Sequence, residues 1–195
     1  PRIEGPGFAT PEDAAKAYLM GLRNRDIDAM LSAFAVESYV EHYDLEAAAE
    51  RIKVYFPLQE IRLPNSNAYH LKLNIASRRD QLIKTITNQY LYYNSPDTLN
   101  DFENVHFEGT DDIADFFEGI ERDTEKYVFA DLEIGDVHEP EDVSELYSTD
   151  KNLKNIARQA EMFGVDEDDV ANVVIEFEAD GQNWLFCPQA VRYNG

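Results

Sequence analysis

Metal-ligating side chains occur along the whole chain, but their spacing is not that of a metal site. The four histidines are too far apart for the H-x-x-x-H or HExxH patterns that place two imidazoles on one helical face: they are His42, His70, His106 and His138. The acidic run from Val165 to Asp169 begins like a calcium loop, yet Val170 and Ala171 stand where an oxygen ligand and a glycine are needed. We therefore predict no bound metal and no cofactor.

The sequence also lacks the motifs used for covalent catalysis and phosphate binding. Cys187 is the only cysteine, so it cannot form a disulfide within the chain, and no histidine lies near it in sequence. It falls in a predicted strand, where we interpret it as a buried, unreactive thiol. There is no G-x-S-x-G turn and no glycine-rich loop after a strand. These absences favour a binding or interaction role over catalysis.

The net charge of the chain restricts its partners. Seventeen Lys and Arg against 39 Asp and Glu give a formal net charge of -22. Nucleic acid and anionic membrane surfaces carry the same sign, so we predict neither as a partner. No apolar run approaches the ~20 residues of a membrane span. The charge is typical of a solubilising surface on an exported protein. The alternative is an acidic surface that mimics nucleic acid or docks on a basic partner.

Two short amphipathic helices are predicted between Gly7 and Ala35. The first begins with Thr10 as N-cap and Pro11 at the first helical position, followed by two acidic residues. After an Arg-Asn-Arg-Asp corner, the second carries apolar residues at i, i+3, i+4 and i+7, namely Ile27, Met30, Leu31 and Phe34. We expect the pair to pack on a sheet through Tyr18, Leu22, Ile27, Leu31 and Phe34.

The middle of the chain is predicted to be mostly helical. A third apolar stripe covers Leu45–Ile52, and Pro57 ends that helix. A polar loop over Leu58–Asn67 leads to a long helix at about Tyr69–Tyr93, although its β-branched residues make a strand the rival over part of it. Another helix starts at Gly109, and its predicted buried face is formed by Ile113, Phe116, Phe117 and Ile120.

Strands are predicted toward the C-terminus. Alternation over Tyr127–Val137 predicts a half-buried strand. A helix at about Lys151–Phe163 follows, and then two alternating segments, Val170–Ala179 and Trp184–Tyr193, flank the turn signal Asp180-Gly181. Helices first and a hairpin last indicate an α+β fold, in which helices pack on an antiparallel sheet. The 195 residues most simply form a single domain.

The N-terminal helix pair resembles the start of the nuclear transport factor 2-like superfamily, especially its small exported bacterial members of unknown function. In that family the run TPEEAAxAYLxALxxGDxDAxxxxFA gives two helices that close the mouth of a cone. The matching residues are Thr10, Pro11, Glu12, Ala14, Ala15, Ala17, Tyr18, Leu19, Leu22, Asp26, Asp28, Ala29, Phe34 and Ala35. Arg25 stands where the family often has glycine. The resemblance extends more loosely over the C-terminal strands and is absent between them.

The resemblance implies a strongly bent antiparallel sheet that wraps the helices and leaves a pocket at its wide end. The helical segment 44–93 is then an insertion that caps or fills this pocket. Tyr39, Trp184 and Phe186 are expected to line it, as an aromatic wall suited to an apolar ligand. Enzymatic members use an acid–base pair inside the cone. The candidates for that chemistry here are His42, Asp44 and Tyr39, with Tyr18 as a donor.

We therefore predict a non-catalytic binding or interaction domain of an exported or cell-envelope bacterial protein. Its expected partner is a small apolar ligand or a protein, and a homodimer stays open. The alternatives are a small-molecule isomerase, dehydratase or cyclase, and an acidic decoy of a nucleic-acid-binding protein. The start PRIEGPGF indicates a processed N-terminus, with a removed signal peptide as one cause. The final Asn194-Gly195 pair is a hairpin signal, so we expect a further strand after it.

Overall fold

A computed structural model describes residues 2–54, 59–95 and 105–193 of the chain. The fold is α+β, as the sequence predicts. The helices are α1 (Pro11–Asn24), α2 (Ile27–Ser32), α3 (Val36–His42), α4 (Leu45–Ile52), α5 (Ala68–Asn94), α6 (Thr110–Glu125), α7 (Pro140–Val143) and α8 (Asp150–Phe163), with short 3-10 helices η2 (Glu145–Ser148) and η3 (Glu167–Asp169). The strands are β1 (Glu133–His138), β2 (Val170–Asn172), β3 (Val174–Ala179), β4 (Gln182–Phe186) and β5 (Gln189–Val191).

The predicted helix pair at the N-terminus is confirmed as α1 and α2. Thr10 Oγ1 accepts a hydrogen bond from the Asp13 N–H at 3.2 Å, and Asp26 Oδ1 accepts one from the Ala29 N–H at 2.9 Å. Arg25 stands where the family that the helix pair resembles often has glycine, and it adopts a left-handed φ of 57°. Glycine adopts that conformation most easily, which accounts for glycine at this position in that family. The Arg25 guanidinium lies over the Tyr127 ring, 4.3 Å from its centroid.

The predicted C-terminal hairpin is also confirmed. β3 and β4 pair antiparallel with Ala179 opposite Gln182, and the two residues between them, Asp180 and Gly181, have φ of 53° and 70°. Positive φ at both positions is the turn geometry that matches strand twist. β1 pairs with the other edge of β3, which gives the order β1-β3-β4. Beyond Val173, whose N–H donates to Pro188 O at 3.0 Å, the hairpin continues as the separate ribbon β2-β5.

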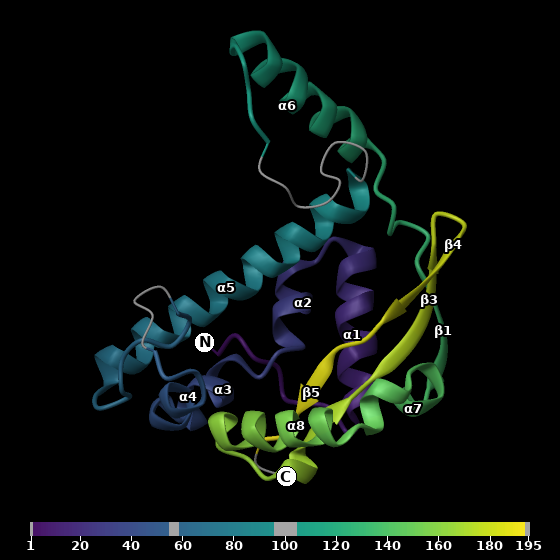
Figure 1. Ribbon diagram of the computed structural model, residues 1–195. Coiled ribbons are helices and arrows are strands. Elements are labelled where there is room, and N and C mark those ends of the chain that lie inside the picture. Colours follow the sequence, from purple (N-terminus) through teal and green to yellow (C-terminus); the bar gives the residue numbers. More distant parts are fainter. Residues whose placement is uncertain (1, 55–58, 96–104, 194–195) are drawn as a thin grey trace.

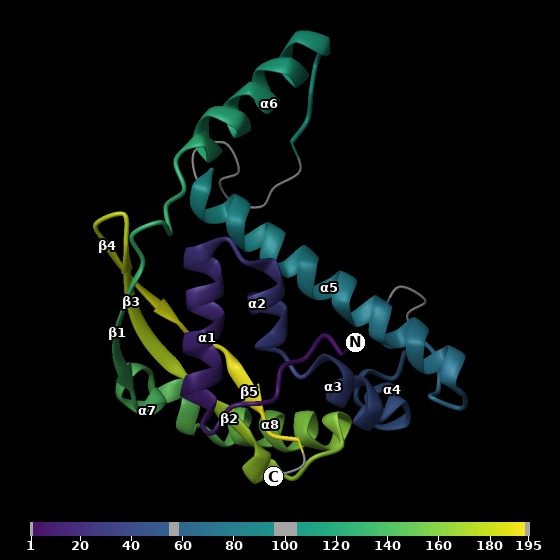
Figure 2. The ribbon, with the colours of Figure 1, turned by 180° about the vertical axis from the view of Figure 1, so that it is seen from behind.

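The core lies between the sheet, the α1–α2 pair and α5 (Figure 2). α1 packs on the strands and on α2, and α2 contacts α5 in turn. The largest fully buried side chains of this core include Leu19, Leu22, Leu31, Phe129, Leu132, Ile175 and Phe177. The Tyr127 hydroxyl donates a hydrogen bond to Leu22 O, which joins α1 to the segment before β1.

Two expectations about this core are wrong. Ile27 is the first residue of α2 and is 51% exposed, whereas Met30, one turn later, is 3% exposed and fills the interior. The strand predicted over Tyr127–Val137 begins only at Glu133. Residues 127–132 form turns, in which the Ala130 N–H donates to Tyr127 O and the Leu132 N–H to Phe129 O, both at 3.1 Å. These turns bury Phe129 and Leu132, a spacing that does not follow strand alternation.

α3, α4 and α5 form the predicted helical middle of the chain. α5 is a helix of 27 residues, so the strand alternative is wrong, and Asn67 Oδ1 caps it by accepting hydrogen bonds from the Tyr69 and His70 N–H groups. α4 ends at Ile52, and Lys53 takes a left-handed φ of 55°. The predicted stop at Pro57 and the final Asn194-Gly195 turn lie outside the described residues.

The N-terminus of α3 is capped from a distant part of the chain. Ala35 has no side-chain acceptor, and the Glu4 carboxylate accepts hydrogen bonds from Ser38 N–H and Ser38 Oγ, both at 2.8 Å. In return the Glu37 carboxylate accepts from the Ile3 and Glu4 N–H groups at 2.7 and 3.0 Å. This exchange fastens residues 3–4 to α3 and supplies an acceptor for an N–H group that a helix start otherwise leaves unsatisfied.

Two further findings concern the surface. Cys187, expected to be buried, is exposed, because it stands between β4 and β5 where the hairpin divides. In the described parts of the chain, every helix is too short or too polar to cross a bilayer.

Candidate interaction surface

α6 projects away from the rest of the molecule, and this is clear from both sides (Figures 1 and 2). We call residues 105–126 the α6 arm. Its helix starts where the sequence predicts: Asp112 Oδ2 accepts hydrogen bonds from the Glu108 and Gly109 N–H groups at 3.0 and 3.1 Å. Acidic residues in the first turn also suit the positive end of the helix dipole. The helix is therefore well formed although little of it touches the body.

Two of the four residues predicted to form the buried face of α6, Phe116 and Ile120, are partly buried, and the other two are exposed, which corrects half of the sequence expectation. Phe117 is 58% exposed and Ile113, one turn before it, is 40% exposed. Phe116 is partly covered, because its ring meets Phe107 edge-on at a centroid distance of 5.3 Å. Phe107 is itself 40% exposed. The arm thus presents an apolar surface that the described residues of the body do not cover.

Charge surrounds this apolar surface. The arm contains eight acidic residues and two basic ones: Glu108, Asp111, Asp112, Asp115, Glu118, Glu121, Asp123 and Glu125 against Arg122 and Lys126. Glu118, the next residue after Phe117, and Glu121, one turn after Phe117, are both exposed. Positions i and i+4 lie on the same side of a helix, so the Glu121 carboxylate continues the line of Ile113 and Phe117.

Contacts beside the C-terminal end of the arm join it to the body. After α6, Lys126 forms an ion pair with Asp180 in the β3–β4 turn. At the end of α5, the buried side chain of Asn94 accepts from Val128 N–H at 3.0 Å and donates to Tyr90 O at 2.8 Å. These bonds satisfy polar groups that the turn before β1 would otherwise leave unpaired. The base of the arm is therefore anchored while its apolar face stays free of the core.

A second group of interest lies around Tyr39 on α3. The Arg78 guanidinium stands 4.2 Å from the centroid of the Tyr39 ring, and its Nη1 lies 2.5 Å from Glu60 Oε1. Burial raises the pKa of Glu60, and the Arg78 charge opposes that shift. Burial also raises the pKa of Tyr39, with the nearby Glu60 carboxylate adding to it. The Arg78 Nε atom and the Tyr193 hydroxyl are buried, and neither has a hydrogen-bond partner among the described residues.

A polar hollow of about 330 Å³ opens next to this group. It is lined by His42, Gly164, Val165, Asp166, Asp169, Arg192 and Tyr193. His42 Nδ1 lies 2.8 Å from Ser38 O, so this nitrogen carries the proton and donates. Arg192 Nη2 lies 2.6 Å from Asp169 Oδ1, which neutralises two of the lining charges. The acidic run from Val165 to Asp169 thus contributes η3 and one wall of this hollow.

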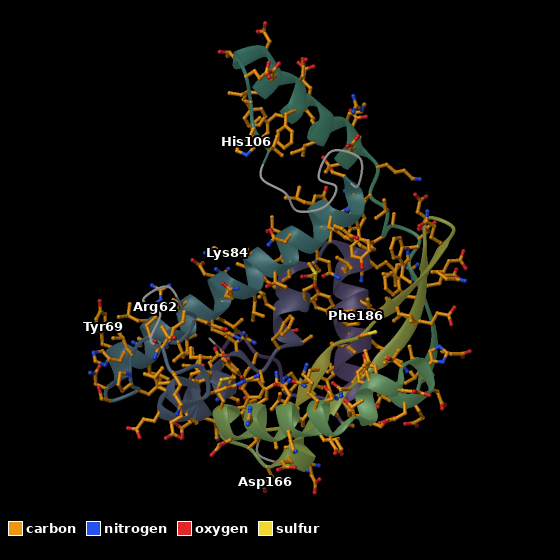
Figure 3. All side chains as sticks on the ribbon, viewed as in Figure 1. Arg62, Tyr69, Lys84, His106, Asp166 and Phe186 are labelled. Carbon is orange, nitrogen blue, oxygen red and sulfur yellow. The ribbon has the colours of Figure 1, made fainter. Side chains whose placement is uncertain are left out.

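The residues predicted to line one pocket fall into two aromatic groups. Phe186 (Figure 3) stacks on Tyr18 with centroids 5.4 Å apart, between α1 and the hairpin. Trp184 meets Tyr93 edge-on at a centroid distance of 4.9 Å. Both pack against the main core, whereas Tyr39 contacts Phe163 and Tyr43 outside it. The structure therefore brings Trp184 and Phe186 to one core and leaves Tyr39 in the group around Arg78.

Of the residues proposed for acid–base chemistry, Tyr39 and His42 lie together on α3 next to the hollow, whereas Asp44 and Tyr18 serve elsewhere. Asp44 is exposed and caps α4 by accepting from the Glu46 and Ala47 N–H groups. The Tyr18 hydroxyl donates to Gln89, and burial raises the Tyr18 pKa to about 12. Among the residues that can be placed (2–54, 59–95 and 105–193), no three His, Cys, Asp or Glu side chains come together as a metal site requires.

Sequence reasoning missed the group of Glu60, Arg78 and Tyr193. These residues come from three distant segments, and none belongs to a local motif. Ile113 and Phe117 were identified, but as core. The signal that could have placed them at the surface is the density of acidic residues around them. Comparison of the chain with protein-family models, with curated proteins and with solved structures finds no match.

Proposed function

We propose that this protein is a non-catalytic interaction module and that the α6 arm is its docking element. The single observation that carries the proposal is the exposure of Phe117 and Ile113 on a helix that projects from the body. Burying a Phe or Ile side chain contributes about 1.5–3 kcal/mol. An apolar surface rimmed by charged residues is typical of a protein-binding site. A partner that covers these two side chains would gain the hydrophobic stabilisation that the fold leaves unused.

The proposal is tested by an unbiased peptide selection. Peptides displayed on phage are selected on the wild-type chain and counter-selected on the double variant Ile113→Ser/Phe117→Ser. A matched control, Leu146→Ser/Leu153→Ser, removes two other exposed apolar side chains, 73% and 52% exposed, at the opposite end of the molecule. We expect peptides that bind the wild type and the control but not the arm variant. Peptides that bind all three equally, or no enriched peptide, would reject the proposal.

The alternative function is that of a small-molecule enzyme, and one observation favours it. Tyr193 lines the polar hollow, its buried hydroxyl has no hydrogen-bond partner within residues 2–54, 59–95 and 105–193, and burial raises its pKa. An unpaired buried hydroxyl is costly and can be satisfied by a ligand. The test measures the shift in the thermal unfolding midpoint that benzoate, a small carboxylate, causes in the wild type and in Tyr193→Phe. A rise in the wild type alone would show that the hollow binds oxygenated molecules. Equal shifts in the two proteins, or no shift in either, would reject this alternative.

We also propose that the fold is a variant of the nuclear transport factor 2-like cone. The support is the α1–α2 pair, which carries the matching residues, and the long hairpin that divides at Val173. The bacterial extracytoplasmic location expected from the resemblance and from the net charge of -22 belongs to the same proposal. The location is tested by fusing a reporter protein behind the N-terminal part of the natural gene product and measuring whether the reporter is exported.

A further inference from the structure

We propose that the partner of the α6 arm is a basic amphipathic helix, with lysine or arginine side chains flanking an apolar stripe. This inference rests on the proposed function, because it names the partner of the same surface. It begins from the charges around Phe117. Glu118 follows it directly, Glu121 lies one turn further along the same side, and both are exposed. A partner that covers the Phe117 ring must therefore place its own rim against carboxylates.

The negative charge of the arm distinguishes between the partners that could bind its apolar surface. The arm has eight acidic and two basic residues, within a chain of net charge -22. A second copy of this chain would bring two acidic arms together, and an anionic membrane or a nucleic acid would be repelled in the same way. A cationic protein segment is attracted instead. Like charges facing each other at an interface oppose binding, so charge favours the basic partner over a homodimer.

The shape of the arm indicates a helical segment. α6 has 16 residues, which corresponds to a rod of about 24 Å. Its exposed apolar side chains are spaced by one turn, at Ile113 and Phe117, and therefore form a narrow stripe rather than a pocket. An amphipathic helix offers a matching stripe with anchors at i, i+3 and i+4. Two helices packed along such stripes exclude water from both apolar surfaces.

The test uses three labelled helical peptides of about 18 residues. Each has the same leucine stripe, and the flanking positions are all lysine, all glutamine or all glutamate. Binding to the whole chain is measured by fluorescence anisotropy at about 50 mM and about 300 mM salt. We expect the lysine peptide to bind at least about tenfold more tightly than the glutamine peptide, the glutamate peptide to bind least, and salt to reduce the difference.

Charge variants of the chain locate the effect. Glu118→Gln/Glu121→Gln should weaken binding of the lysine peptide by about threefold or more. The control Glu141→Gln/Glu145→Gln removes the same charge from exposed sites around α7 and should leave affinity within about twofold. An equal effect of the two pairs would show attraction to net charge alone and would overturn the inference.

Failure of this inference can be distinguished from failure of the proposed function. If the glutamine peptide binds as tightly as the lysine peptide and both lose binding to Ile113→Ser/Phe117→Ser, the arm docks an apolar helix of any charge. The proposed function then stands and the basic partner is wrong. If the lysine peptide binds the wild type and this double variant equally, or if no peptide binds, both proposals are overturned.

Discussion

α1 and α6 are amphipathic helices of similar length, 14 and 16 residues, and they lie in different surroundings. On α1, Leu19 and Leu22 have exposed fractions of 0% and 1%, because the sheet and α2 cover them. On α6, Phe117 is 58% exposed. A helix makes an apolar face by its own periodicity, but a second element must cover that face. For α1 the cover comes from the same chain, and for α6 we propose that a partner supplies it.

The largest effect that separates the two regions is expected from Phe129, at the centre of the body. Its ring is fully buried, with centroids 5.3 Å from Tyr93 and 5.7 Å from Tyr127. Phe129→Ala should lower the free energy of unfolding by about 3–5 kcal/mol, because it removes buried area and leaves a cavity. In the arm, Phe107→Ala should cost less than about 1 kcal/mol. Urea titrations of both variants measure their free energies of unfolding. Equal losses of stability would contradict the difference between body and arm.

A second contrast concerns the room for a side chain at two glycines, one in the body and one in the arm. Gly164 ends α8 with φ of 67°, and a Cβ there would lie 2.3 Å from His42 O. Gly164→Ala should therefore cost about 1–3 kcal/mol through strain and displacement of α3. Gly109, the N-cap of α6, has an extended φ of -155° and open space around its Cβ position. Gly109→Ser should cost nothing, since serine is a preferred N-cap. A tolerated Gly164→Ala would mean that α8 and α3 pack loosely.

A buried tyrosine of the body should make the free energy of unfolding fall at high pH. Burial raises the Tyr18 pKa to about 12, compared with about 10 for an unfolded tyrosine. Between these values the unfolded chain releases a proton that the folded chain keeps, so stability falls as pH rises, by up to about 1.4 kcal/mol per pH unit from this residue. Tyr18→Phe should make that fall shallower. Tyr69→Phe, on an exposed ring, is the control in urea titrations from pH 9 to pH 12, and identical slopes for all three proteins would contradict the prediction.

The elements that sequence predicted correctly are those that local residues determine. Thr10 as a helix cap, and Asp180-Gly181 as a hairpin turn, each act within a few residues. The strand register then follows from the turn, and the α+β class follows from the order of the elements.

The features that sequence could not predict depend on distant contacts. Glu4 caps α3 from 34 residues away, and Arg78 meets Tyr39 through α5 packing on α3. Periodicity identified Ile113 and Phe117 as one apolar face but carried no information about what covers it. Trp184 and Phe186 were expected beside Tyr39 from a family resemblance, whereas their contacts are Tyr93 and Tyr18 in the main core.

The free energy of unfolding of Ile113→Ser/Phe117→Ser is the most direct test of the central claim, that the apolar face of α6 is a docking surface. Unfolding in urea is followed by helix circular dichroism and by the fluorescence of the single tryptophan, Trp184, which lies in the body. The account predicts a change within about 1 kcal/mol of the wild type, because surface substitutions alter stability little. A loss of about 4 kcal/mol or more would show that these side chains belong to the core and would contradict the account.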